Sequence, residues 1–265
     1  MSAPIVASLD GVVGIIELAR PEKFNCLSQA AWRAIDEARA SFEQDRSVRA
    51  ILIRAQGKHF CTGADLEEVK GIRNNKRALE IFMACGSSAL DRLEASPLPV
   101  VAAVQGLCLA GGIELMLGAD VVFAGRSARM GDQHAQFGLI PGWGGSQRLA
   151  RALGVRRALD LMFSARWLDA EEARSFGLVN TIVDDDKLHH DAMAYCAKLA
   201  ERSRIGLAEM KRLARKGIEL TLKDGLALEA KAAVKHIMGN DVAEGLSAFE
   251  TRRRPKFART DQRCR

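Results

Sequence analysis

Several residue types are too scarce or too scattered in this sequence for particular classes of protein. There is only one tyrosine, aromatic residues make up 5% of the chain, and no zinc-finger or aromatic-rich ribonucleoprotein motif occurs. Nucleic acid is therefore a minor candidate partner. The six cysteines are widely spaced without a C-x-x-C pair, which argues against both a zinc site and a disulfide framework. Reduced thiols fit better, so we expect a cytoplasmic location.

Signals for export and for membrane insertion are also lacking. Residues 1–18 carry no positive charge ahead of their apolar residues, which argues against a signal or transit peptide. The longest uncharged run, residues 95–113, has the length of a membrane span. However, it contains Pro97, Pro99 and three glycines, and Glu114 follows at once. We therefore expect no transmembrane segment.

The overall composition is that of an ordinary folded protein with an excess of positive charge. The 265 residues are 48% hydrophobic and 27% charged, which is enough to bury one sizeable core. The formal net charge is +6, and three arginines are adjacent at residues 252–254. This excess favours an anionic partner, either a small molecule or, as the minor alternative, nucleic acid.

Strand and helix patterns alternate along most of the chain. Strands are expected at 6–8, 12–18, 48–54, 99–104 and 119–124, and the first two form a hairpin around Asp10-Gly11. Helices are expected after an N-cap at Ser28, from Asp65 onwards, at 76–94 and at 112–117. This alternation indicates an α/β fold, with helices covering a sheet. Residues 188–250 show helical periodicity only. We therefore expect a core at residues 1–190 and a helical C-terminal subdomain at residues 191–265.

Two loops each lead from a strand through a glycine into a helix. They read GKHFCTGADL, residues 57–66, and GLCLAGGIEL, residues 106–115. The start of a helix presents free N–H groups and a partial positive charge, and a glycine lets a ligand oxygen approach them. In known enzymes each such donor stabilises an oxyanion by about 3–4 kcal/mol. Close packing of helix on strand is the alternative explanation for these glycines.

These two loops and four further segments resemble the signatures of the crotonase (enoyl-CoA hydratase/isomerase) superfamily. The further segments are ARPEKFN at 19–25, IPGWGGSQRL at 140–149, LDAEEARSFGLVN at 168–180 and EGLSAFETRRRPKF at 244–257. Their order and separation also fit, and they span nearly the whole chain. The resemblance implies a spiral of ββα units with a helical C-terminal trimerisation subdomain. It also implies a homotrimer or a dimer of trimers.

The resemblance further implies an acyl-CoA thioester substrate, with no cofactor beyond the CoA that is part of it. The thioester carbonyl would lie between the N–H groups of Ala64 and Gly111, and these donors would stabilise an enolate. The candidate CoA-binding residues are Ala64, Asp65 and Leu66 in the first motif, with Lys23 and Arg252 as weaker candidates for phosphate contacts.

Hydratases of this family use two glutamates, and this chain matches only the first. Glu114 is the predicted general base, although a first-turn carboxylate also favours the helix dipole. The second position, counted back from Pro141, is His134. Imidazole can replace a carboxylic acid as proton donor near neutral pH. Asp132 either orients this histidine or caps a short helix starting at Gln133.

Trp143 is the other departure, because the family often has a small residue at this place among the glycines of the third motif. It either packs on the surface or in the core, or it shapes the acyl pocket toward small or flat groups. The leading hypothesis is hydration of an α,β-unsaturated acyl-CoA, with Glu114 as base and His134 as possible acid. Double-bond isomerisation, or C–C hydrolysis or decarboxylation of a CoA thioester, is the main alternative. A non-catalytic or nucleic-acid-binding protein of this fold is a minor one.

Overall fold

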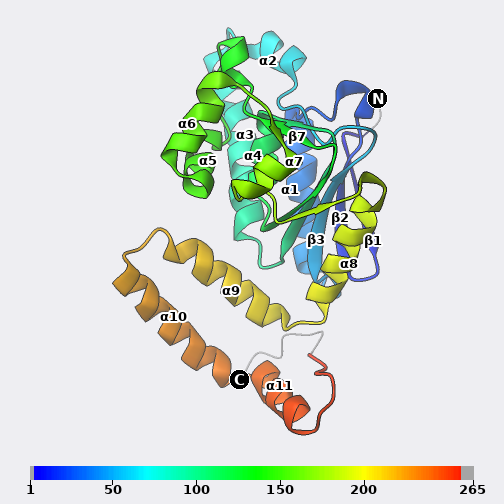
Figure 1. Cartoon of the computed structure of the whole chain (residues 1–265), viewed down its shortest axis with the longest axis vertical. Helices are drawn as coiled ribbons and strands as arrows, with labels where there is room; N and C mark the ends of the chain where they lie inside the picture. The colour runs from blue at the N-terminus through cyan, green and yellow to red at the C-terminus, as the bar shows by residue number, and fades with distance from the viewer. Residues whose placement is uncertain (1–2, 258–265) are drawn as a thin grey trace.

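A six-stranded sheet forms the centre of the structure, a computed structural model that describes residues 3–257 (Figure 1). In spatial order its strands are β1 (Ile5–Asp10), β2 (Val13–Leu18), β3 (Ala50–Ala55), β4 (Val100–Val104), β6 (Val121–Gly125) and β9 (Thr181–Val183). The first two pair antiparallel as the predicted hairpin, and the remaining neighbours are parallel. The expected α/β class is therefore confirmed.

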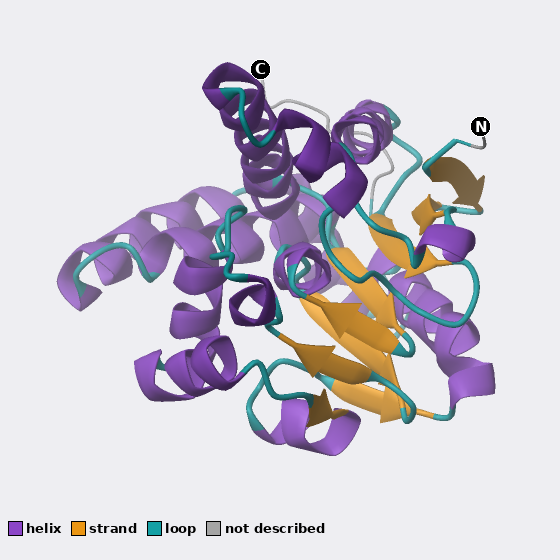
Figure 2. Ribbon diagram, turned by 90° about the horizontal axis from the view of Figure 1, so that it is seen from above, coloured by secondary structure: helices purple, strands orange, loops and turns teal. Residues whose placement is uncertain are grey.

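Both faces of this sheet are covered by helices (Figure 2). Ile51 and Ile53 of β3 belong to the large apolar cluster that also contains buried residues of α1 (Gln29–Gln44), α3 (Lys76–Ala95) and α4 (Gly111–Leu117). Leu52, between them, belongs to a second cluster on the opposite face with α8 (Leu188–Ala200). Burial on both faces is typical of parallel strands and explains why their sequences are almost continuously apolar.

Helices α1 and α2 begin where the sequence predicts. Ser28 accepts a hydrogen bond from the Ala31 N–H at 3.2 Å and caps α1, whose buried face includes Ile35 and Phe42. Asp65 caps α2 (Leu66–Ile72) through two backbone N–H groups. In both helices a short polar side chain takes up N–H groups that have no partner within the helix.

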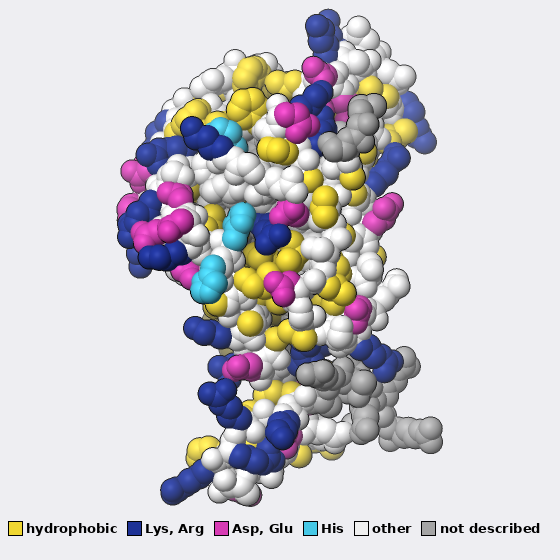
Figure 3. Space-filling model, turned by 90° about the vertical axis from the view of Figure 1, so that its right-hand side faces the viewer, with side chains coloured by type: hydrophobic (Ala, Val, Ile, Leu, Met, Phe, Trp, Pro, Cys, Tyr) yellow, Lys and Arg dark blue, Asp and Glu magenta, His cyan; other side chains and the backbone are white. Residues whose placement is uncertain are grey.

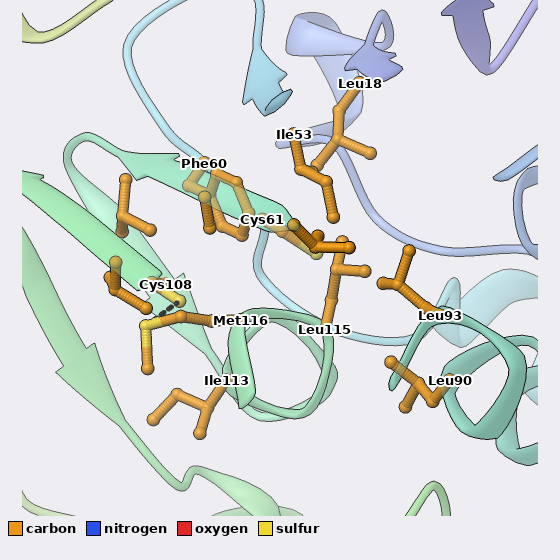
Figure 4. Close-up of a cluster of buried hydrophobic side chains, with 14 of the residues drawn as sticks. Leu18, Ile53, Phe60, Cys61, Leu90, Leu93, Cys108, Ile113, Leu115 and Met116 are labelled. Atoms are coloured by element: carbon orange, nitrogen blue, oxygen red, sulfur yellow. Dashed lines mark hydrogen bonds between the residues drawn. The ribbon is translucent and has the colours of Figure 1, made fainter. Parts of the chain in front are cut away.

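Helices α3 and α4 and the sheet enclose an apolar core (Figure 4). The side chains drawn there include Leu90 and Leu93 from α3 and Leu115 and Met116 from α4. The sulfur of Cys108 lies 4.0 Å from that of Met116. All five cysteines within the described residues are free thiols; the sixth, at position 264, lies outside them.

A second, smaller sheet lies beside the first, and none of its strands was predicted from the sequence. It consists of β5 (Leu107–Leu109), β7 (Arg129–Gly131) and β8 (Leu168–Asp169). The interval 105–111 was expected to be a loop, and this expectation is wrong because it contains β5. Three residues are too short for a readable strand pattern. The glycine loop at 57–66 therefore follows a strand of the large sheet, whereas the one at 106–115 contains a strand of the small sheet.

The second half of the core consists mainly of short helices. They are α5 (Gly145–Leu153), α6 (Val155–Ser164) and α7 (Ala170–Ser175), with 3-10 turns at His134–Phe137 and Asp185–Lys187; another 3-10 turn, Pro21–Lys23, follows β2.

Three helices then leave the core as an arm: α9 (Arg204–Gly217), α10 (Leu222–Ile237) and α11 (Asn240–Glu250) (Figure 1). Because α8 packs on the sheet, the expected boundary at residue 190 falls inside it, and the helices that leave the core begin at α9. Lys211 of α9 ties the arm to the core through an ion pair of 2.7 Å with Asp120. No helix within residues 3–257 is both long enough and apolar enough to cross a membrane.

Candidate active site

The two glycine loops run side by side and reach their helices at the same place. The Cys61 N–H donates to the Leu107 carbonyl at 3.1 Å, and the Leu109 N–H donates to the Cys61 carbonyl at 2.9 Å. Cys61 and Cys108 form a parallel β-bridge. This pairing brings the starts of α2 and α4 next to each other.

At the end of this pairing two backbone donors remain free. Gly63 has a φ of +107°, and a Cβ at this residue would lie 3.1 Å from the Gly111 nitrogen. The N–H groups of Ala64 and Gly111 donate no hydrogen bond to another atom of the part of the chain that the structure describes. The structure therefore brings together the two predicted donors, and a glycine keeps the space beside them open.

The residue before Gly111 has an unusual backbone conformation. Ala110 is the N-cap of α4 with φ +49° and ψ −116°, a region that residues with a Cβ rarely adopt. Its N–H donates to the Gly131 carbonyl at 2.9 Å, which holds the turn against β7. Strain of this kind costs about 1–3 kcal/mol and is characteristic of functional sites.

Glu114 lies in the first turn of α4 and is 1% exposed. Its Oε1 accepts hydrogen bonds from the N–H groups of Trp143, at 2.8 Å, and Gly145, at 2.7 Å. Gly145 is the first residue of α5, so the start of one helix holds the carboxylate of another. One oxygen of Glu114 is therefore fixed, and Oε2 remains available for chemistry.

His134 faces that second oxygen. Its Nε2 lies 3.9 Å from Glu114 Oε2, and its Nδ1 lies 2.9 Å from Oδ1 of Asp132. The same Asp132 oxygen accepts the backbone N–H of His134 at 3.2 Å. Asp132 therefore orients the imidazole. The predicted cap is wrong, because the short helix begins at His134 and its N-cap is Gln133. The predicted acid and base lie together.

Different interactions shift the pKa values of Glu114 and His134. Burial raises the pKa of Glu114 above its ordinary 4.5, and the N–H donors and His134 offset this only in part. Burial alone would lower the pKa of His134, but the bond to Asp132 and the charges of Asp132 and Glu114 outweigh it and raise the pKa above 6.5. A protonated histidine and an ionised glutamate therefore stabilise each other at this site.

The predicted CoA-binding residues of the first motif have different surroundings. The Asp65 side chain is occupied, because it caps α2 and forms an ion pair of 3.1 Å with Arg20. Leu66 is half exposed. The Lys23 amine lies 2.5 Å from Glu67 in a solvent-exposed ion pair. Leu66 is therefore accessible next to Ala64, Lys23 lies in an exposed ion pair, and Asp65 holds the loop in place.

Arg252 is not brought to this site within one chain. It follows α11 in the arm, which lies at the opposite end of the molecule from α2 (Figure 1).

Trp143 is buried in the core and is 3% exposed. Its ring packs against Trp32 and Phe82, with ring centroids 4.9 Å and 5.3 Å away. Of the sequence-based alternatives, the structure excludes surface packing and shows core packing.

The donors that orient Glu114 were missed by the sequence analysis. They are the backbone N–H groups of Trp143 and Gly145, which no residue type announces. The sequence feature that pointed to them is the glycine-rich stretch 142–145. A Cβ at Gly145 would lie 3.1 Å from Glu114 Cγ and Oε1. The glycine there permits the close approach on which the hydrogen bond depends.

Comparison with known proteins agrees with this geometry. The family model described as enoyl-CoA hydratase/isomerase matches residues 9–260. The chain belongs to this family. A probable enoyl-CoA hydratase of Rhizobium meliloti is 34% identical over 96% of this chain and 97% of its own length. A mitochondrial methylglutaconyl-CoA hydratase of Mus musculus is 33% identical over 93% of this chain and 79% of its own.

Solved structures of the family show the same fold. The crystal structure of an enoyl-CoA hydratase from Bacillus anthracis superimposes with a TM-score of 0.92 at 32% identity, covering 97% of this chain and 100% of that one. The crotonase resemblance and its fold are therefore confirmed, and the chain is an enzyme of the enoyl-CoA hydratase/isomerase family.

Proposed function

We propose that this enzyme hydrates an α,β-unsaturated acyl-CoA thioester, with Glu114 as general base and His134 as acid. The observation that supports this most directly is the position of Glu114: it is buried in the same first helical turn as Gly111, and its Oε2 lies 3.9 Å from His134 Nε2. The names of the relatives, several of them hydratases, support the reaction class.

In the proposed reaction the thioester carbonyl accepts hydrogen bonds from the N–H groups of Ala64 and Gly111. Glu114 Oε2 takes a proton from a water molecule, whose oxygen forms a bond to Cβ. The electron pair of the double bond moves onto the carbonyl oxygen as an enolate, which the two donors stabilise. His134 Nε2 then donates a proton to Cα, and the carbonyl re-forms. The product is the 3-hydroxyacyl-CoA.

The catalytic pair must then recover its starting protonation. After the reaction Glu114 holds the proton from water, and His134 has lost its own. At 3.9 Å the two atoms are too far apart for a direct hydrogen bond, but one water beside both can relay the proton. Asp132 favours the return because its carboxylate stabilises the imidazolium.

Turnover of crotonyl-CoA, followed by ultraviolet absorbance and product mass, tests the proposal. Glu114→Gln keeps the shape and removes the base, so we expect kcat to fall about 10²–10⁴-fold, while a saturated acyl-CoA still binds. His134→Ala should give a similar loss. The matched controls are Glu171→Gln and His190→Ala, whose side chains are exposed on other elements. Retained turnover in Glu114→Gln refutes its role as base.

Isomerisation is the second candidate, and the Asp132–His134 pair is the observation that favours it. A histidine held in one orientation could return the proton that Glu114 removes to a different carbon. The same pair could serve C–C hydrolysis or decarboxylation of a CoA thioester. Incubation with a 3-enoyl-CoA separates isomerisation from hydration. If His134→Glu gains hydratase activity that the parent lacks, the natural histidine serves one of these other reactions.

We also propose that the arm covers a second copy of the chain. Its helices expose many large apolar side chains, which a single chain leaves uncovered; they are Ile205, Met210, Ile218, Leu222, Leu226, Val234, Ile237, Met238, Leu246 and Phe249. A trimer or a dimer of trimers accounts for them. Arg252, at the end of the arm, would then contact a neighbour's CoA. Light scattering on the purified protein measures the assembly, and a monomer contradicts it.

The cytoplasmic location remains a prediction from cysteine usage.

Nucleic-acid binding remains the minor alternative. On the face shown in Figure 3, acidic side chains are interspersed with the basic ones, and no single basic strip follows the surface. Binding that weakens steeply with salt, without turnover of any acyl-CoA, would favour this alternative.

A further inference from the structure

The indole of Trp143 fills a slot between α3 and α4 that two glycines create. A Cβ at Gly86 of α3 would lie 2.4 Å from Trp143 Nε1, and a Cβ at Gly111 of α4 would lie 2.7 Å from its Cζ3. Both distances are shorter than any real contact. The ring is therefore in direct contact with both backbones, and any side chain at either glycine would displace it.

One end of this slot is the catalytic site. Gly111 carries one of the two free N–H donors, and the backbone N–H of Trp143 itself holds Glu114 Oε1 at 2.8 Å. In the proposed reaction the carbonyl binds at Gly111 and Cβ lies at Glu114. The rest of the acyl chain therefore leaves from a point beside the indole.

The far side of the slot is apolar. Trp32 of α1 and Phe82 of α3 pack against the ring and are themselves fully buried. The Nε1 of Trp143 has no hydrogen-bond partner among the described residues. The indole thus occupies an apolar space that an alkyl chain could also fill. No polar contact of its ring requires a tryptophan at this position.

We propose that Trp143 sets the upper size limit of the acyl group, so that the enzyme acts on short acyl-CoA thioesters. This inference rests on the proposed function. Replacing the indole with a small side chain would free a volume on the order of 150 Å³, about that of an apolar cavity that admits benzene. A longer acyl chain would then enter the slot between Gly86 and Gly111.

Kinetics with 2-enoyl-CoA substrates of four, six, eight and ten carbons test the proposal. A pocket that excludes an extra methylene discriminates by about 10–200-fold. We therefore expect kcat/KM of the parent to fall at least about tenfold between four and eight carbons. In Trp143→Ala and Trp143→Leu this ratio of kcat/KM between the four-carbon and eight-carbon substrates should approach one.

Trp32→Leu is the matched control, because it removes a buried indole from the same cluster on the α1 side. It should lower the melting temperature and leave the chain-length profile unchanged. A parent that converts ten-carbon and four-carbon substrates equally well overturns the proposal without any variant. So does an unchanged profile in the folded Trp143→Leu protein.

Binding of saturated acyl-CoA esters separates this proposal from the proposed function. The parent should bind butyryl-CoA at least about tenfold more tightly than decanoyl-CoA, and Trp143→Leu should reverse this preference. This result, together with no hydration of any enoyl-CoA, would refute the hydratase and leave the size limit standing. Equal binding of both esters by the parent would refute the size limit alone.

Discussion

Substitution of Asp132 by Asn removes one charge from the catalytic cluster and almost nothing else. The side chain keeps its shape and keeps an oxygen that can accept a hydrogen bond from Nδ1 of His134, which lies 2.9 Å from Oδ1. In the proposed mechanism Glu114 must be ionised and His134 protonated. Activity is therefore lost as pH falls through the pKa of Glu114, which is raised above 4.5, and as pH rises through that of His134, which is raised above 6.5.

The size of the expected change follows from the geometry. Asp132 is almost completely buried, so water screens its charge poorly. An opposite charge at this distance changes a pKa by about 1–3 units, and each unit corresponds to about 1.4 kcal/mol. Burial alone lowers the pKa of His134, so without Asp132 this pKa should fall. The alkaline limb of the activity profile should therefore move to lower pH.

The assay is kcat/KM for crotonyl-CoA across the pH range, with the parent and Asp132→Asn measured side by side. The variant should lose far more activity at alkaline pH than at acid pH, where the histidine is protonated in both proteins. Asp184→Asn, which removes an exposed carboxylate, is the control and should leave both limbs in place. A uniform loss at every pH, with the alkaline limb unmoved, refutes the claim that Asp132 keeps His134 protonated.

Three backbone positions give further predictions, each measured as the free energy of unfolding in denaturant. Gly112→Ala should destabilise the protein by about 2–3 kcal/mol, because its Cβ would lie 2.3 Å from the Cys61 carbonyl oxygen; wild-type stability contradicts this. Ala110→Gly should stabilise it by about 1 kcal/mol by relieving a positive φ, and a loss of stability contradicts the strain. Gly86→Ala should destabilise the parent by about 1–3 kcal/mol and cost less in a Trp143→Ala background; equal costs contradict the contact.

The parts of the fold that depend on local pattern could be predicted from the sequence. Ser28 caps α1, and the buried face of that helix follows from apolar residues at helical spacing. Glu114 in a first helical turn also follows from the glycines just before it. A three-residue strand such as β5 carries no such pattern. Its existence depends on hydrogen bonds with β7, which lies about twenty residues further along the chain.

The candidate site was predictable only in its residue types. Resemblance to the family pointed to Ala64, Gly111, Glu114 and His134, and the structure brings these four together. The orientation of Glu114 depends on N–H groups at positions 143 and 145, about thirty residues away. Every residue except proline has a backbone donor, so no sequence pattern distinguishes these two. Only the fold decides which of them meet the carboxylate.

Position 143 combines two roles that can vary independently. Its backbone N–H holds the carboxylate of Glu114, the proposed base, and any residue other than proline supplies that N–H. Its side chain fills the slot beside Gly111, and there the size of the residue decides how much space remains. A substitution can therefore change the acyl group that fits without moving the base that acts on it. On one scaffold, this arrangement allows the substrate to change while Glu114 keeps its position.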